Sequence, residues 1–128
     1  MTIKQRYRIK AHLSVVWDAL INKDTIESWG GGPALISPIL GENFSLWGGD
    51  IHGKITNVIS QKLLSQEWFY HSWKNPSHVS FYLSFDNNET QIDIIHDHIP
   101  DNDVREIEDG WKNHFIGQIK QYLEDKKY

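Results

Sequence analysis

Hydrophobic and polar residues alternate at the start of the chain and then switch to helical spacing. The alternation over residues 3–9 predicts a half-buried strand. The stretch HLSVVWDALIN, residues 12–22, carries apolar residues at the spacing of an amphipathic helix. A second short helix follows, for which Asp24 is the expected N-cap and the glycines at 30–32 are the expected end. The pattern therefore predicts one strand followed by two short helices.

Between Pro33 and His98, β-rich runs are separated by short turn sequences such as LGE, GGD and DNNE. Connections of hairpin length between such runs are typical of an antiparallel meander. The runs predict strands at residues 34–37, 43–47, 51–58, 62–70, 78–85 and 90–98. Together with the first strand, the predicted sheet has about seven strands.

Helical spacing returns after Pro100 and continues for about 24 residues, or roughly 36 Å at about 1.5 Å per residue. A sheet with one apolar face needs cover, and a long helix laid across that face provides it. We therefore predict an α+β fold in which a curved antiparallel sheet wraps around the C-terminal helix. Trp111 and Phe115 are expected to face the sheet, while His114 is expected on the flank of the helix without a chemical role.

The length and composition refine this prediction. A chain of 128 residues can close one core and is too short for two, so residues 1–128 are expected to form a single domain. Six Trp, five Tyr and five Phe accompany a single Met, the initiator. A pocket in this fold would therefore be lined by rigid rings and not by flexible thioethers.

Charge and cysteine content narrow the classes of partner. The formal charge of −4 disfavours nucleic acid and anionic membranes, which require a concentrated positive surface. The absence of Cys excludes disulfides and thiolate metal sites. The N-terminus has no apolar core of a signal peptide, and no apolar run approaches membrane-spanning length. We expect a cytoplasmic protein without nucleic-acid partners or membrane insertion, of undetermined oligomeric state.

Basic residues occupy alternate positions in the first predicted strand, at residues 4, 6, 8 and 10. They could bind an anion or a membrane surface. If the first strand lies beside the last, Asp93 and Asp97 would face them instead, and opposite charges commonly pair across antiparallel strands. We favour the cross-strand pairing.

Two polar positions fall among the inward residues of predicted strands. His96 and His98 share one face of a strand, as two ligands of a metal would, but no third ligand has suitable spacing, so no metal site is predicted. His96 would instead be a polar point among apolar side chains. Gln66 shares the face of Trp68, and a buried amide there would bind either a neighbour or a ligand.

Several segments resemble the family of activators of the ninety-kilodalton heat-shock protein ATPase. The segments that carry the resemblance are KAHLSVVWDALINKDTIESW, GENF, GKITNV, KLLSQEW, IIHDHIPDND and GWKNHFIGQIKQYL, which together cover nearly the whole chain. The chain is thereby identified as similar to the C-terminal-domain-like members of that family. This family lies in the START-related, birch-pollen-allergen-like superfamily with a helix-grip fold, so the resemblance implies a hydrophobic cavity between the sheet and the C-terminal helix.

Three hypotheses about function follow from the residues and the resemblance. The leading one is non-catalytic binding of a small hydrophobic molecule, lipid-like or aromatic, without a cofactor. Its proposed cavity residues are Trp29, Trp47, Gln66, Trp68, Phe81, His96, Trp111 and Phe115. The second is a co-chaperone-like interaction module that acts on the heat-shock protein. The third is an enzyme of the cyclase or hydrolase type, for which His96 is the one candidate group.

Overall fold

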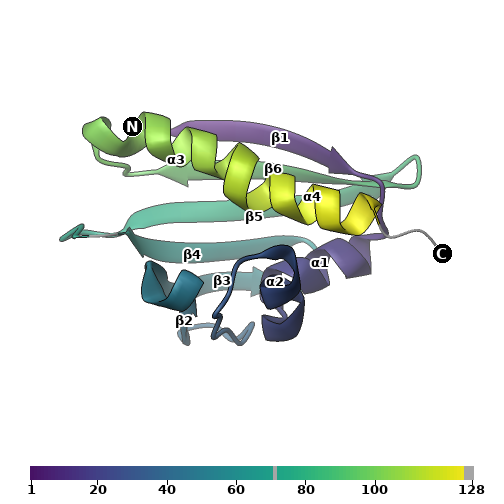
Figure 1. The fold of residues 1–128 in the computed structure, drawn as a ribbon, viewed down its shortest axis with the longest axis horizontal. Helices are drawn as coiled ribbons and strands as arrows, with labels where there is room; N and C mark the ends of the chain where they lie inside the picture. Colours follow the sequence, from purple (N-terminus) through teal and green to yellow (C-terminus); the bar gives the residue numbers. More distant parts are fainter. Residues whose placement is uncertain (71, 126–128) are drawn as a thin grey trace.

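The computed structural model describes residues 1–70 and 72–125 and has an α+β architecture. A curved antiparallel sheet of six strands forms one layer, and the helices pack against one of its faces (Figure 1). The strands are β1 (Ile3–Ile9), β2 (Asn43–Leu46), β3 (Ile51–Ile59), β4 (Leu63–Tyr70), β5 (Ser77–Asp86) and β6 (Glu89–Asp97). Their order across the sheet is β1-β6-β5-β4-β3-β2, so the first and last strands in sequence are neighbours, as predicted.

The sheet has six strands and not the predicted seven, because residues 34–37 do not form a strand. Leu35 makes a single bridge with Ser45, and the backbone then leaves the sheet. Pro33 and Pro38 flank this short segment, and proline has no backbone N–H to donate to a strand ladder. The β-rich run is therefore too short between its prolines to extend the pairing.

The two short helices after β1 are capped by side chains. In α1 (Leu13–Ile21), the Nδ1 atom of His12 accepts a hydrogen bond from the backbone N–H of Ser14 at 3.2 Å. In α2 (Lys23–Trp29), the N-cap is Asn22 and not the predicted Asp24, because the Asn22 Oδ1 atom accepts from the second and third N–H groups of the helix at 2.9 and 3.2 Å.

The C-terminal helix runs across the sheet in front of β5, β6 and β1 (Figure 1). It consists of a 3₁₀ turn η2 (Asp101–Asp103), α3 (Val104–Gly110), a π-helical turn η3 (Trp111–Phe115) and α4 (Ile116–Glu124). A Cβ atom on Gly117 would lie 1.7 Å from the carbonyl oxygen of Lys112, five residues earlier. The π turn therefore brings two backbone segments so close that only glycine fits at residue 117.

Side chains of alternate residues on the strands fill the space between the sheet and the helix. Alternation along residues 78–85 predicts that Val79, Phe81, Leu83 and Phe85 share the inward face. Val79, Phe81 and Leu83 are indeed buried. Phe85 is 40% exposed, because it lies near the β5–β6 turn, where it contacts the ring of His12. Within the described residues, no helix is long and apolar enough to span a membrane.

Arg6 and Arg8 of β1 pair with acidic residues of the β5–β6 hairpin. Arg6 lies opposite Asp93 and donates to its carboxylate at 2.7 Å, which confirms the predicted cross-strand pair. Arg8 binds Asp86 and Glu89, at 2.6 and 2.8 Å. Asp97 does not pair with a base of β1, since its carboxylate contacts His98 at 2.7 Å.

Candidate functional site

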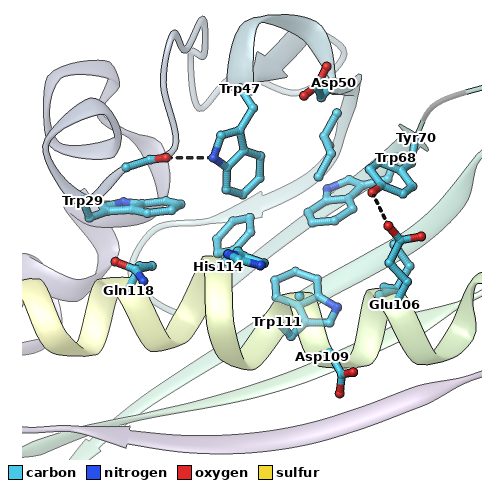
Figure 2. Close-up of a pocket in the computed structure, with 15 residues that line it drawn as sticks. Trp29, Trp47, Asp50, Trp68, Tyr70, Glu106, Asp109, Trp111, His114 and Gln118 are labelled. Atoms are coloured by element: carbon cyan, nitrogen blue, oxygen red, sulfur yellow. Dashed lines mark hydrogen bonds between the residues drawn. The ribbon is translucent and has the colours of Figure 1, made fainter.

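A pocket of about 550 Å³ lies between the C-terminal helix and the segments that contain α2, β3 and β4 (Figure 2). Its floor is aromatic and its rim is polar. The floor and walls include five of the eight predicted cavity residues, Trp29, Trp47, Trp68, Trp111 and Phe115. The remaining lining residues are Gly30, Asp50, Ile51, Tyr70, Glu106, Ile107, Asp109, Gly110, His114 and Gln118.

Trp29 and Trp47 meet because the end of α2 is bonded to the 3₁₀ turn η1 (Trp47–Gly49). Gly30 ends α2 with a left-handed φ of 108°, which an L side chain rarely adopts. Its carbonyl then accepts from the indole Nε1 of Trp47 at 2.7 Å, and the carbonyl of Gly31 accepts from the Trp47 backbone at 2.8 Å. The two indoles lie edge to face, with ring centroids 6.0 Å apart.

Trp47 itself has a positive φ of 49°. This conformation is strained for a bulky residue, and such strain is often found at functional sites. The hydrogen bonds at the Trp47 backbone and indole hold the ring at the mouth of the pocket. Among the aromatic residues predicted to line the cavity, Trp47 alone is partly exposed.

Phe115 is the centre of the aromatic cluster. Its ring centroid lies 4.8 Å from that of Trp111, 5.0 Å from that of Trp29 and 5.8 Å from that of Trp68. Trp68 from the sheet and Trp111 from the helix stack at 4.9 Å with an interplanar angle of 25°. These rings therefore fill much of the space between sheet and helix, and the pocket is the part that remains open above them.

The other three predicted cavity residues lie in the core beneath the pocket and do not line it. Phe81 packs edge to face against Trp111. The Oε1 atom of Gln66 accepts from the indole N–H of Trp68 at 2.7 Å, so the buried amide has a neighbour as its partner. His96 is fully buried behind Trp111.

His96 connects the sheet to the C-terminal helix through both ring nitrogens. The indole N–H of Trp111 donates to Nδ1 at 3.1 Å. Nδ1 is therefore the unprotonated nitrogen, and Nε2–H donates to the hydroxyl oxygen of Ser77 at 2.8 Å. Burial is the main cause that lowers the His96 pKa from 6.5 to about 3, so the ring is neutral at physiological pH.

The contact between Ser77 and His96 was missed by sequence reasoning, because the two residues come from different strands. The pair resembles the nucleophile and base of a hydrolase only in part. The third partner is an indole and not a carboxylate, and neither Ser77 nor His96 is exposed. Within the described residues, no group of His, Asp or Glu has the arrangement of a metal site.

Sequence reasoning also missed the polar rim of the pocket. Tyr70 donates a hydrogen bond to Glu106 at 3.1 Å, and Asp50 and His114 also lie at the rim. His114 was expected to have no chemical role on the flank of the helix, and the structure places it, exposed, at the mouth of the pocket (Figure 2). The one available signal was the crowding of acidic residues at the start of the C-terminal helix.

Comparison with known proteins identifies one family. The family model described as Activator of Hsp90 ATPase homolog 1-like protein matches residues 10–124. An activator of 90 kDa heat shock protein ATPase homolog from Dictyostelium discoideum is 24% identical over 122 residues, which are 93% of this chain and 32% of that protein. Homolog 1 from Mus musculus is 23% identical over 101 residues, 77% of this chain and 30% of that protein. The chain thus spans about a third of the length of these curated relatives.

Solved structures share the fold over nearly the whole chain. An HSP90 activator from Plasmodium falciparum has a TM-score of 0.89 at 21% identity, with 97% of this chain and 96% of that chain covered. The Aha1 dimer from Colwellia psychrerythraea has a TM-score of 0.84 at 22% identity, with 100% and 99% covered. These structures confirm the predicted helix-grip fold.

Proposed function

The chain belongs to the Activator of Hsp90 ATPase homolog 1-like family, and on this premise we propose that it is a co-chaperone-like interaction module that acts on the ninety-kilodalton heat-shock protein. The observation that carries this proposal is the match of the family model to residues 10–124, which include every helix and five of the six strands of the described residues. It supports the chaperone hypothesis better than the ligand-binding hypothesis that leads from the sequence alone. A shared compartment with the chaperone, expected to be the cytoplasm, is part of the proposal.

We place the contact with the chaperone on the loop between α2 and β2. Leu35, Ile39 and Leu40 are exposed by 65%, 57% and 67%, although large aliphatic side chains usually avoid water. Exposed apolar side chains that cluster in one segment are typical of protein interaction sites. Removing them should weaken binding without disturbing the core.

The test is the ATPase rate of the host's ninety-kilodalton heat-shock protein, measured with and without the purified chain. We expect the chain to change the rate in a saturable way. The variant Leu35→Ser/Ile39→Ser/Leu40→Ser should lose at least about tenfold in affinity, since each truncated contact residue at an interface can cost about 1 kcal/mol.

The matched control is Val15→Ser/Tyr82→Ser, which removes apolar side chains exposed by 44% and 45% on other elements. It should act like the unmodified chain. If the unmodified chain neither binds the chaperone nor changes its ATPase rate, the proposed function is rejected. If the loop variant binds as well as the unmodified chain, the function stands and the contact lies elsewhere.

A second candidate function, binding of a small hydrophobic molecule, is favoured by the pocket. Its volume of about 550 Å³ lies within the usual range for small-molecule sites, and its floor holds the Trp and Phe residues proposed from the sequence. Native mass spectrometry of the purified chain, with displacement of a fluorescent apolar probe, tests this candidate. We expect bound probe in the unmodified chain and weaker binding in Trp47→Ala, whose ring is the partly exposed wall.

A further inference from the structure

The rim of the aromatic pocket has one sign of charge. The acidic residues Asp50 and Glu106 border the aromatic rings, and none of the described lining residues is Lys or Arg. Among the described lining residues His114 is the one histidine, and it is exposed at the mouth. A ligand in this pocket therefore meets negative charge at the rim.

Asp50 and Glu106 lie on either side of the Trp68 and Tyr70 rings (Figure 2). Glu106 accepts the hydroxyl hydrogen bond of Tyr70 at 3.1 Å and keeps its second oxygen available. The pKa of Tyr70 is raised first by burial, then by Glu106, Asp103 and Asp50. The carboxylate of Asp50 forms no hydrogen bond or ion pair with any described residue, so no cation among the described residues neutralises it.

The aromatic rings at the floor of the pocket attract the same kind of ligand as the acidic rim. The π face of an aromatic ring is the negative end of its quadrupole, and Trp attracts cations most strongly. Trp47, which is partly exposed at the mouth, contributes such a ring, whereas Trp68 is buried and already stacks on Trp111. A cation held there would interact with π faces and carboxylates at once, while an anion would be repelled by both.

We propose that this pocket binds a small organic cation with an apolar body, such as a quaternary ammonium that carries an aryl group. This inference rests on the second candidate function, binding of a small molecule in the pocket, and gives that ligand a charge. The apolar body lies against the exposed part of Trp47, and the cationic head lies near the carboxylates of Asp50 and Glu106 at the rim. A neutral molecule of the same shape retains only the apolar contact.

Three probes of matched size test the charge preference. They are benzyl(2-hydroxyethyl)dimethylammonium, its neutral isostere in which a quaternary carbon replaces the nitrogen, and phenylmethanesulfonate. Each is titrated into the full chain while the indole N–H signals are followed by NMR, with Trp47→Phe to assign the signal of Trp47. The cation should shift the Trp47 signal and bind at least about fivefold more tightly than the neutral isostere, and the sulfonate should not bind.

A pair of charge-matched variants locates the head group. Asp50→Asn/Glu106→Gln removes two rim charges and retains an acceptor for Tyr70, and should weaken cation binding about fivefold. Asp101→Asn/Glu108→Gln removes the same two charges from exposed residues outside the pocket and should bind the cation as the unmodified chain does.

The outcomes separate this inference from the function on which it rests. Equal affinity for the cation and the neutral isostere, or equal losses in the two variants, would overturn the cation preference and leave the small-molecule pocket in place. If none of the three probes binds and native mass spectrometry shows no occupancy, both are rejected. The chaperone proposal is measured separately by the ATPase rate.

Discussion

His96 has a structural role, because both of its ring nitrogens already have hydrogen-bond partners. It accepts from Trp111 on the C-terminal helix and donates to Ser77 on the neighbouring strand. A buried polar group with both bonds made costs little, whereas a group left without a partner costs about 1–3 kcal/mol. His96 thus fixes the depth at which Trp111 sits on the sheet.

The low pKa of His96 gives stability a pH dependence of known sign. The folded state keeps the ring neutral down to about pH 3, whereas the unfolded chain takes up a proton near 6.5. As pH falls through that interval the unfolded state binds more protons, so the free energy of unfolding falls by up to about 1.4 kcal/mol per pH unit from this group. Above the unfolded value, His96 contributes no further change.

Urea unfolding between pH 7 and pH 4 measures this effect. His96→Asn should be less stable at pH 7 by about 1–3 kcal/mol, because Trp111 or Ser77 loses a partner, and its stability should depend less steeply on pH. His52→Asn on β3 replaces an exposed histidine that does not act on His96, and it is the control for the loss of a histidine. Equal slopes for His96→Asn and the unmodified chain would contradict the assignment.

At the scale of elements, the π turn in the C-terminal helix depends on one glycine. Gly117→Ala would place a methyl group against the Lys112 carbonyl and should destabilise the fold by about 1–3 kcal/mol. Gly110→Ala is the matched control, because Gly110 has ordinary helical φ and ψ and its added methyl group would meet no atom within 4 Å. It should stabilise the fold by about 0.5–1 kcal/mol.

Thermal and urea unfolding of both variants provide the measurement. Stabilisation by both substitutions would show that the π turn converts to α-helix without cost. Destabilisation by both would show that the helix tolerates no side chain on this flank.

The helix also shows where sequence reasoning stops. Trp111 and Phe115 were placed on the inward face by counting residues at the α-helical period, and the structure confirms both as buried. The π turn adds a residue to one turn, which no hydrophobic period reveals, and His114 consequently lies at the pocket mouth. Gln66 could be placed inward from strand alternation, but its bond to Trp68 depends on side-chain conformation.

At the scale of the whole molecule, the elements and their order were accessible from the sequence because each has a strong period or turn signal. The pocket was not, because its walls come from four separate segments of the chain whose distances depend on packing. Residues 34–37 are the opposite case, in which the sequence predicts an element that the structure lacks. Their aliphatic composition suggests a strand, but the flanking prolines prevent one.

The proposal that residues 1–128 form a single domain predicts one cooperative unfolding transition. The sheet and both helical regions share buried contacts through Trp29, Phe115 and Trp68, so no element should unfold alone. Urea curves from far-ultraviolet circular dichroism and from tryptophan fluorescence should coincide. Separate midpoints would mean that the helix and the sheet unfold independently.

The stack of Trp68 on Trp111 gives the molecule an optical property of its own. Two indoles at 4.9 Å and 25° share their electronic excitation, so the ultraviolet spectrum of the pair differs from that of two isolated rings. One ring belongs to the sheet and the other to the helix, so that spectral difference vanishes when the two separate. The protein therefore carries an intrinsic chromophore that reports, without any label, whether its C-terminal helix is packed on the sheet.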